Sequence, residues 1–299
     1  MKLDRFLEQK APGQAKRMAV AAAEGVEVLT AVSEAAKLGL VEPVLVGDEA
    51  KIRRIIEEQG FALGGFEIVN RADHKQAAET AVELVRRGEA KVLMKGVLVS
   101  SILMKAILNR ETGIRESKTL NIVSLIDSPM MERLLLLTDA GMVLYPTLEQ
   151  KIDMINNCVR VARNIGIEEP KVACLAALEQ INPNMPPTMD AAALAMMSQR
   201  GQFKNCVVDG PYQLDLAINP HAVKEKGLTT TSPVAGNADI LLVPNIETGN
   251  IVNKALRYLG GCHIAGLMAG ASAPVVMASR ADSPQNKLYS IGFAIAAAD

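Results

Sequence analysis

Short apolar runs alternate with longer amphipathic stretches along most of the 299 residues. The apolar runs that predict strands are 18–23, 43–47, 66–69, 91–94, 121–126, 172–177, 206–209, 240–244, 264–268 and 275–278. The stretches that predict helices are 26–38, 49–59, 74–87, 148–165, 191–199, 250–259 and 285–297. Strands that alternate with helices predict parallel sheets with crossover connections, so we expect an α/β fold.

The number of predicted strands favours two domains over one. Ten strands are many for a single twisted sheet, and 299 residues are many for a single core. We expect a first α/β domain formed by residues 1–145 together with 273–299, and a second formed by residues 146–272. The cleft between two such domains is the expected ligand site.

Composition and charge argue against several classes of function. The formal net charge is -1 and aromatic residues make up 3% of the chain, which does not fit a nucleic-acid-binding surface. Residues 1–10 are charged throughout, and aliphatic runs such as Leu134–Leu137 are far too short to span a membrane. We therefore expect a cytoplasmic protein with neither a nucleic-acid nor a membrane partner.

The cysteines and histidines do not show the spacing of a metal site. No CxxC pair occurs, and we expect reduced, buried thiols at Cys158, Cys174, Cys206 and Cys262. The three histidines also lack ligand spacing, so no metal is expected at His74, His221 or His263. A Ser-His-Asp triad that uses His221 or His263 stays open, although no G-x-S-x-G elbow accompanies it.

Polar groups follow several predicted strands, and ligands of open α/β sheets bind at the carboxyl ends of strands. Lys95 and Gly96 combine an ammonium group with room for close backbone approach. Asp209 opens a D-G-P turn, and Ser232 closes a run of four hydroxyls. Asn250 and Lys254 share one helix face because they are four residues apart, and Thr248 is the predicted N-cap of that helix.

The last predicted strand is followed by Ser279, Arg280 and Asp282. The arginine can donate two parallel hydrogen bonds to a phosphate, and a hydroxyl and a carboxylate lie beside it. Each strand exit alone also has an ordinary explanation as a turn, a solvated lysine or a helix cap, here Asp282 or Ser283. Together the exits favour a phosphorylated or phosphate-bearing ligand.

The order and spacing of these residues resemble the phosphate acetyltransferase and butyryltransferase family. The matching motifs are Lys95-Gly96, V-D-G-P ending at Pro211, S-P-V-A-G ending at Gly236, G-N-I-x-x-K ending at Lys254, and Ser279-Arg280. The resemblance runs from about residue 90 to the end, whereas the N-terminal third matches only in its α/β pattern. The short chain, the Lys95-Gly96 pair and the S-R-A-D-S run look more like the butyryltransferase branch.

This resemblance implies reversible transfer of a short-chain acyl group, butyryl rather than acetyl, between coenzyme A and inorganic phosphate. It implies direct attack in a ternary complex, with coenzyme A as a substrate and with no cofactor. The implied fold is the two-domain arrangement of isocitrate and isopropylmalate dehydrogenases, with three-layer α/β/α sheets. The implied assembly is a homodimer or a larger homo-oligomer.

The resemblance also implies roles for single residues. Ser279 would hydrogen-bond the sulfur or the developing oxyanion, and Arg280 would clamp the phosphate. The acetyltransferases carry an acidic residue at the position of Asn286, so Asp282 is the predicted base here. The other predicted contacts are Lys95, Gly96, Lys105, Asp209, Ser232, Asn250 and Lys254 for substrate or phosphate, and Arg257 for coenzyme A.

Three alternatives stay open. The first is acetyl transfer within the same family. The second is a metal- and NAD-dependent decarboxylating dehydrogenase on the same fold, which needs an aspartate cluster, whereas Asp209 and Asp239 lie at separate predicted strand ends. The third is a non-catalytic sensor of coenzyme A or acyl phosphate, against which the Ser279-Arg280 pair argues.

Overall fold

The computed structural model describes residues 2–10, 15–62, 65–228, 230–277 and 282–298. Their internal contacts divide the chain into two compact units, Met1–Ser117 with Ile264–Asp299, and Lys118–His263. The sequence placed the two boundaries later, after residue 145 and before residue 273. Residues 118–145 group with the second unit because they include strand β6 (Leu135–Thr138), which pairs with β9 (Ile240–Leu242). Strand β10 (His263–Ala269) pairs with β11 (Val275–Val276), and Ile264 accordingly begins the return to the first unit.

The strands of the first unit follow one another in the order β3-β2-β1-β4-β11-β10. Their bounds are β1 Lys16–Ala21, β2 Val41–Gly47, β3 Ile68–Asn70 and β4 Val92–Lys95, with β11 and β10 as given above. Every neighbouring pair from β3 to β11 is parallel, and only the β11–β10 pair is antiparallel. Small aliphatic residues fill β1 and β4 and are buried, as parallel strands covered on both faces require.

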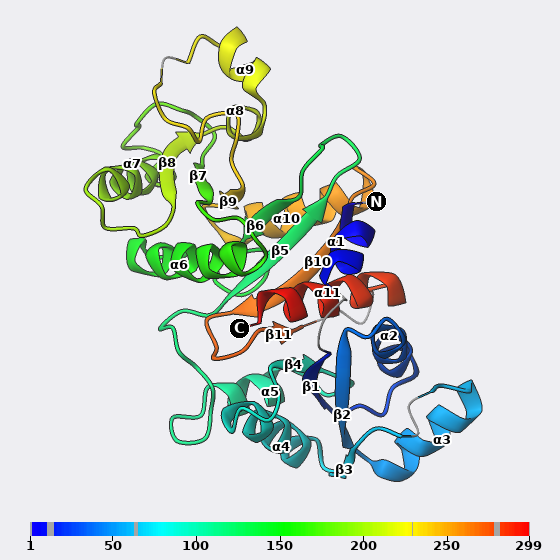
Figure 1. The fold of residues 1–299 in the computed structure, drawn as a ribbon. Helices are drawn as coiled ribbons and strands as arrows, with labels where there is room; N and C mark the ends of the chain where they lie inside the picture. Colours follow the sequence, from blue (N-terminus) through cyan, green and yellow to red (C-terminus); the bar gives the residue numbers. More distant parts are fainter. Residues whose placement is uncertain (1, 11–14, 63–64, 229, 278–281, 299) are drawn as a thin grey trace. The chain divides into compact units, whose positions relative to one another are not determined.

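The helices of the first unit form two groups (Figure 1). Helix α4 packs against α5, whereas α1, α2 and α11 pack together. Their bounds are α1 Lys2–Lys10, α2 Val26–Lys37, α3 Glu49–Gln59, α4 His74–Arg86, α5 Ser100–Ile107 and α11 Pro284–Ala297. Right-handed crossovers account for the two groups, because β2 lies on one side of β1 and β4 lies on the other.

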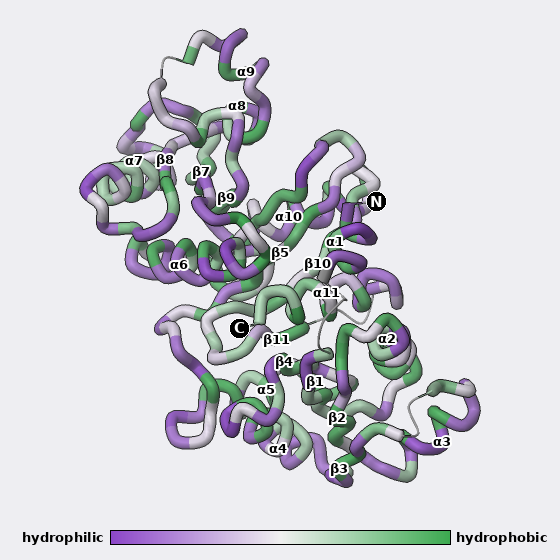
Figure 2. The backbone as a smooth tube through the Cα atoms, in the orientation of Figure 1, coloured by the Kyte–Doolittle hydropathy of each residue, from purple (hydrophilic) through white to green (hydrophobic). Residues whose placement is uncertain are grey.

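The second unit has the strand order β5-β6-β9-β7-β8, with β5 at Asn121–Asp127, β7 at Lys171–Leu175 and β8 at Val207–Tyr212. Only β5 and β6 are antiparallel, and the other pairs are parallel. Its helices are α6 Leu148–Asn164, α7 Pro186–Gln199, α8 Leu214–Ile218, α9 Pro220–Glu225 and α10 Ile246–Tyr258. Strands such as β5 are largely hydrophobic along the chain trace, whereas hydrophobic and hydrophilic residues alternate along helices such as α6 (Figure 2).

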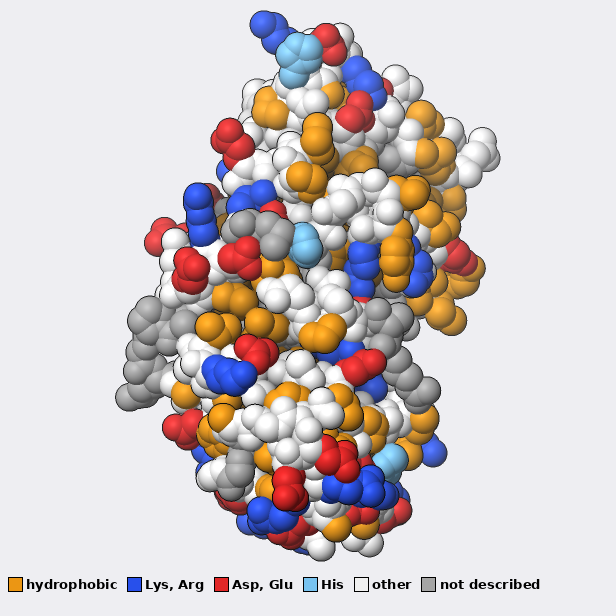
Figure 3. All heavy atoms as spheres, turned by 90° about the vertical axis from the view of Figure 1, so that its right-hand side faces the viewer, with side chains coloured by type: hydrophobic (Ala, Val, Ile, Leu, Met, Phe, Trp, Pro, Cys, Tyr) orange, Lys and Arg blue, Asp and Glu red, His pale blue; other side chains and the backbone are white. Residues whose placement is uncertain are grey.

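The predicted α/β class, with helices flanking mostly parallel strands, is confirmed. One local prediction is wrong: the N-cap of α10 is Asn245, whose Oδ1 accepts from the Thr248 backbone N–H at 3.0 Å, and Thr248 therefore lies inside the helix. No helix in the described part of the chain is both long and apolar enough to cross a membrane. Basic and acidic side chains are intermingled on the face drawn in Figure 3, as the near-zero net charge leads us to expect.

Candidate functional site

Lys95 and Gly96 lie where the strand order of the first unit reverses, between β1 and β4. Ligands of open α/β sheets bind outside the strand ends at such a point. The buried Lys95 ammonium donates to the carbonyl oxygens of Gly96 at 3.1 Å and Leu98 at 3.2 Å. A Cβ on residue 96 would lie 1.9 Å from the Ala22 carbonyl oxygen, so the exits of β1 and β4 can meet only if this residue is glycine.

Strand β11 runs parallel to β4 with Val276 beside Met94, so the chain after β11 leaves the sheet at the same edge as Lys95. The predicted catalytic pair, Ser279 and Arg280, lies outside the described residues. Asp282 is half-buried, and its carbonyl oxygen accepts a hydrogen bond from Lys287 Nζ at 2.5 Å.

Ser283 is the N-cap of α11, and its Oγ accepts from the Asn286 backbone N–H at 3.2 Å. Of the two capping residues that the sequence left open, Ser283 therefore caps the helix. Asn286 stands where the resemblance expects an acid, and its buried Oδ1 has no hydrogen-bond partner within the described chain. An amide oxygen is a poor proton acceptor at neutral pH, so Asp282 stays the predicted base of this segment.

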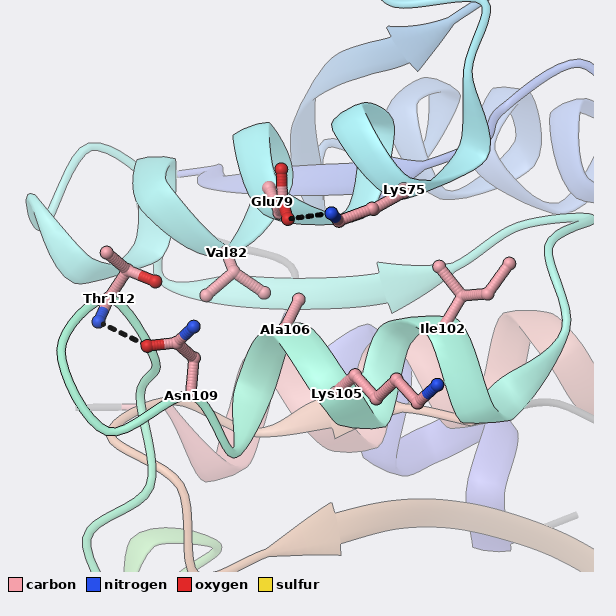
Figure 4. Close-up of a pocket in the computed structure, with 8 residues that line it drawn as sticks. All are labelled: Lys75, Glu79, Val82, Ile102, Lys105, Ala106, Asn109 and Thr112. Carbon is pink, nitrogen blue, oxygen red and sulfur yellow. Dashed lines mark hydrogen bonds and ion pairs between the residues drawn. The ribbon is translucent and has the colours of Figure 1, made fainter.

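Lys105 lies apart from these groups, in a pocket of about 540 Å³ between α4 and α5. Figure 4 shows Val82, Lys75 and Glu79 projecting from α4, opposite Ile102, Lys105 and Ala106 on α5. The lining includes none of the other predicted site residues, and the Lys105 side chain is exposed. Its phosphate contact stays a prediction.

In the second unit, Tyr212 contacts the predicted site residue Asp209. The Tyr212 hydroxyl donates a hydrogen bond to Asp209 Oδ2. Burial and the neighbouring Asp209 carboxylate raise the pKa of Tyr212, which therefore stays a neutral donor at physiological pH. The sequence did not indicate this tyrosine, because the strand was expected to end at Asp209 and to turn at the D-G-P motif, whereas β8 continues to Tyr212.

A shallow hollow of about 510 Å³ lies at the exits of β7 and β8. Its lining consists of Ala176, Ala177, Gln213, Leu214, Asp215 and Ile218. The Lys226 ammonium, 2.7 Å from Asp215, lowers the pKa of that carboxyl, so Asp215 is ionised and paired with Lys226 at neutral pH. The volume is in the range that small-molecule ligands occupy.

Helix α10 carries three further predicted contacts. The Asn250 side chain donates to the Ala140 carbonyl at 3.2 Å, Lys254 is exposed, and Arg257 is half-buried. Gly249 permits this approach, because a Cβ there would lie 2.1 Å from the Asp139 carbonyl oxygen. The G-N-I-x-x-K motif thus fixes the start of α10 against the loop after β6.

The thiols are poorly suited to nucleophilic catalysis. Burial raises the pKa of Cys174 to about 12 and that of Cys206 to about 11, so both are protonated at neutral pH. The described residues include no group of three or more His, Cys, Asp or Glu side chains arranged to hold a metal ion. The candidate chemistry therefore belongs to the ammonium, guanidinium, hydroxyl, amide and carboxylate groups at the strand exits.

These features define an α/β protein whose strand exits present hydrogen-bonding and charged groups of the kind that bind phosphate-bearing small molecules. The family model described as phosphate acetyl/butaryl transferase matches residues 2–83 and 74–297. The chain therefore belongs to the phosphate acetyl- and butyryltransferase family, as its motifs led us to expect.

Individual relatives agree with this assignment. The chain is 48% identical to a phosphate butyryltransferase of Clostridium acetobutylicum, over 93% of this chain and 92% of the relative. It is 46% identical to a phosphate acetyltransferase of Thermotoga maritima, over 97% of this chain and 98% of the relative.

Solved structures give the same picture of the fold. A branched-chain phosphotransacylase from Enterococcus faecalis V583 is 30% identical, with a TM-score of 0.84 over 94% of this chain and 98% of that protein. A 4-hydroxythreonine-4-phosphate dehydrogenase from Klebsiella pneumoniae is 15% identical, with a TM-score of 0.55 over 95% of this chain and 100% of that protein. The latter likeness shows the fold alone, which is the dehydrogenase-like arrangement expected from the sequence.

Proposed function

We propose that this chain is a phosphate butyryltransferase, which moves a short-chain acyl group reversibly between coenzyme A and inorganic phosphate. The observation that carries the proposal is 48% identity to a phosphate butyryltransferase over 93% of the chain. The S-R-A-D-S run, which begins at Ser279, supports the butyryl branch. The 46% identity to a phosphate acetyltransferase makes acetyl transfer the second candidate.

In the proposed reaction, the coenzyme A thiol loses its proton to a base and attacks the carbonyl carbon of the acyl phosphate. A C–S bond forms, the C–O bond to phosphate breaks, and inorganic phosphate leaves. Arg280 would stabilise the negative charge on the phosphate, and Ser279 would donate a hydrogen bond to the sulfur or the oxyanion. Asp282 would take the thiol proton, and no acyl-enzyme forms.

The proposed assembly is a homodimer or a larger homo-oligomer. Ile251, Tyr258 and Leu259 of α10 and the residue after it are 66%, 68% and 88% exposed, and large exposed apolar side chains on one element favour a protein contact. The proposed location is the cytoplasm, because its reducing conditions keep thiols such as the four free cysteines reduced.

The proposal is tested by following release of free coenzyme A from butyryl-CoA with and without inorganic phosphate. We expect release that depends on phosphate and yields butyryl phosphate in equal amount. Release at the same rate without phosphate would exclude the transferase reaction. A parallel series with acetyl-, propionyl-, butyryl- and isobutyryl-CoA separates butyryl from acetyl transfer by the ratio of kcat/KM values.

Arg280→Ala tests the proposed phosphate clamp. We expect a loss of about 100- to 1000-fold in kcat, the size seen when one transition-state donor is removed. Turnover close to wild type would remove Arg280 from the mechanism. The sensor alternative predicts that coenzyme A binds but that no acyl-CoA turns over, and the dehydrogenase alternative predicts dependence on a divalent metal and NAD.

A further inference from the structure

Lys287 is a buried lysine at the start of the helix that follows the Ser279-Arg280 exit. The residue is 3% exposed, although lysine side chains usually keep their ammonium group in water. Its Nζ donates to Glu27 Oε2 at 2.8 Å and to the Asp282 carbonyl oxygen at 2.5 Å. From the sequence alone, such a lysine is expected on the surface, in contact with solvent.

The position of Lys287 is electrostatically unfavourable in two ways. Removing an ammonium group from water costs free energy that a single ion pair often does not recover. Lys287 also lies in the first turn of α11, which begins at Pro284, and the helix dipole disfavours a cation there. A buried lysine at this position is therefore not expected to stabilise the fold. Its two hydrogen-bond acceptors indicate another role.

The two acceptors join the segment after Arg280 to the centre of the first unit. Asp282 comes two residues after Arg280 and three after Ser279. Glu27 lies in the first turn of α2, directly after the exit of β1. Strand β1 is the neighbour of β4, whose end carries Lys95, so the ammonium ties the Asp282 carbonyl to the same sheet edge.

We propose that Lys287 is a positioning residue for acyl transfer, which holds the Asp282 carbonyl and so fixes the place of Asp282, the proposed base. This inference rests on the proposed function. Lys287 touches no reacting atom in this scheme, and its effect passes through Asp282. Displacements of about 1 Å in such groups can cost about 100-fold in rate.

Lys287→Met tests the proposal, because methionine keeps the length of the side chain and removes the charge. Glu27 is left with 64% of its side chain exposed, so no buried unpaired charge is created. We expect kcat to fall by about 10- to 100-fold. We expect the unfolding midpoint to stay within about 3 °C of wild type, because exchange of a buried ion pair for an apolar side chain is often neutral.

Lys151→Met is the matched control. Lys151 is buried to a similar degree, with 5% of its side chain exposed, and it pairs with Asp190 at 2.6 Å in the second unit. Asp190 does not belong to the predicted site. We expect this variant to keep kcat within about twofold of wild type, since loss of a buried lysine as such is not what slows the reaction.

A double-mutant cycle with Asp282→Asn distinguishes positioning from general damage. If Lys287 acts through Asp282, Lys287→Met slows the Asp282→Asn variant much less than it slows wild type. Multiplicative losses would overturn the proposal, as would a Lys287→Met variant with wild-type kcat. Lys287→Arg can donate to both acceptors and should restore part of the rate. A wild-type protein without phosphate-dependent release would instead refute the proposed function itself.

Discussion

Gly96 lies where the exits of β1 and β4 meet, and backbone atoms occupy the space that any side chain would need. A Cβ would lie 1.9 Å from the Ala22 carbonyl oxygen and 2.6 Å from that of Ala21, and neither backbone group can move without shifting β1. Gly96→Ala should destabilise the protein by about 1–3 kcal/mol, the usual range for overpacking. It should also lower kcat, because Lys95 directly precedes the turn that the substitution would displace.

Urea unfolding measured alongside kcat checks this expectation. Gly266→Ala is the matched control, since a Cβ on Gly266 meets no atom within 4 Å. Equal stability of the two variants would contradict the packing argument at Gly96.

Tyr212 offers a second prediction about a single side chain. Its hydroxyl donates a hydrogen bond to Asp209, and the residue is 4% exposed. Tyr212→Phe keeps the ring but leaves a carboxylate oxygen of Asp209 without its donor, which should cost about 1–3 kcal/mol. If Asp209 and Ser232 contact substrate, KM for acyl-CoA should rise as well.

Tyr145→Phe serves as the control for Tyr212→Phe, because the Tyr145 hydroxyl also bonds a carboxylate, that of Glu247, but the residue is 69% exposed. Exposed pairs of this kind contribute little. A Tyr212→Phe variant with unchanged stability and unchanged KM would show that the hydrogen bond from Tyr212 to Asp209 has no role.

At the scale of the elements, the N-terminus of α6 is closed by a reciprocal cap. Thr147 Oγ1 accepts from the Gln150 N–H at 3.3 Å, and Gln150 Oε1 accepts from the Thr147 N–H at 3.0 Å, which together form a capping box. Thr147→Ala should cost about 1 kcal/mol of stability. The loss should appear in thermal or urea unfolding and leave kcat unchanged.

A threonine-to-alanine substitution inside a helix is the control for Thr147→Ala. Thr30 lies within α2, and its hydroxyl donates to the Val26 carbonyl at 2.8 Å, a bond that competes weakly with the helix. Thr30→Ala should therefore be neutral or slightly stabilising, since alanine has the higher helix propensity. If both variants lose the same stability, the capping box is not the cause.

The elements also show how far the sequence could predict the fold. Apolar runs predicted ten of the strands, because buried parallel strands consist of uninterrupted aliphatic residues. Strand β6 was missed although its leucine run was noticed, since four apolar residues without a period fit a strand or a helix equally well. The N-cap of α10 was misplaced by one turn, because Asn245 and Thr248 are both good caps and only the three-dimensional structure chooses between them.

The site was predictable only in part, for a related reason. Lys95 and Gly96 stand directly at the exit of β4, where a sequence motif indicates position, whereas Asp209 lies inside β8 and Asn250 lies in the second turn of α10. Tyr212 and Lys287 were missed because their roles depend on partners that the folded chain places beside them, Asp209 within β8 and Glu27 through the packing of α11 on α2. Neither a strand tyrosine nor a helix lysine carries a sequence signal that distinguishes it from core or surface.

For the whole molecule, binding of both substrates should be visible as stability, without turnover. A ligand that binds only the folded state adds about 2.7 kcal/mol to the free energy of unfolding at 100 times its Kd. We expect coenzyme A to raise the unfolding midpoint of wild type and of Arg280→Ala alike. Inorganic phosphate should raise it in wild type but not in Arg280→Ala, because only the phosphate contact depends on the guanidinium.

Thermal unfolding at one protein concentration, with potassium chloride at matched ionic strength as the control, measures each increment. Phosphate that stabilises Arg280→Ala as much as wild type would place the clamp on another residue, for which Lys95 and Lys105 are the next candidates. Coenzyme A that stabilises wild type without any acyl transfer would instead favour the sensor alternative. The stabilisation by each ligand therefore measures binding separately from acyl transfer, whereas a rate measurement reports both together.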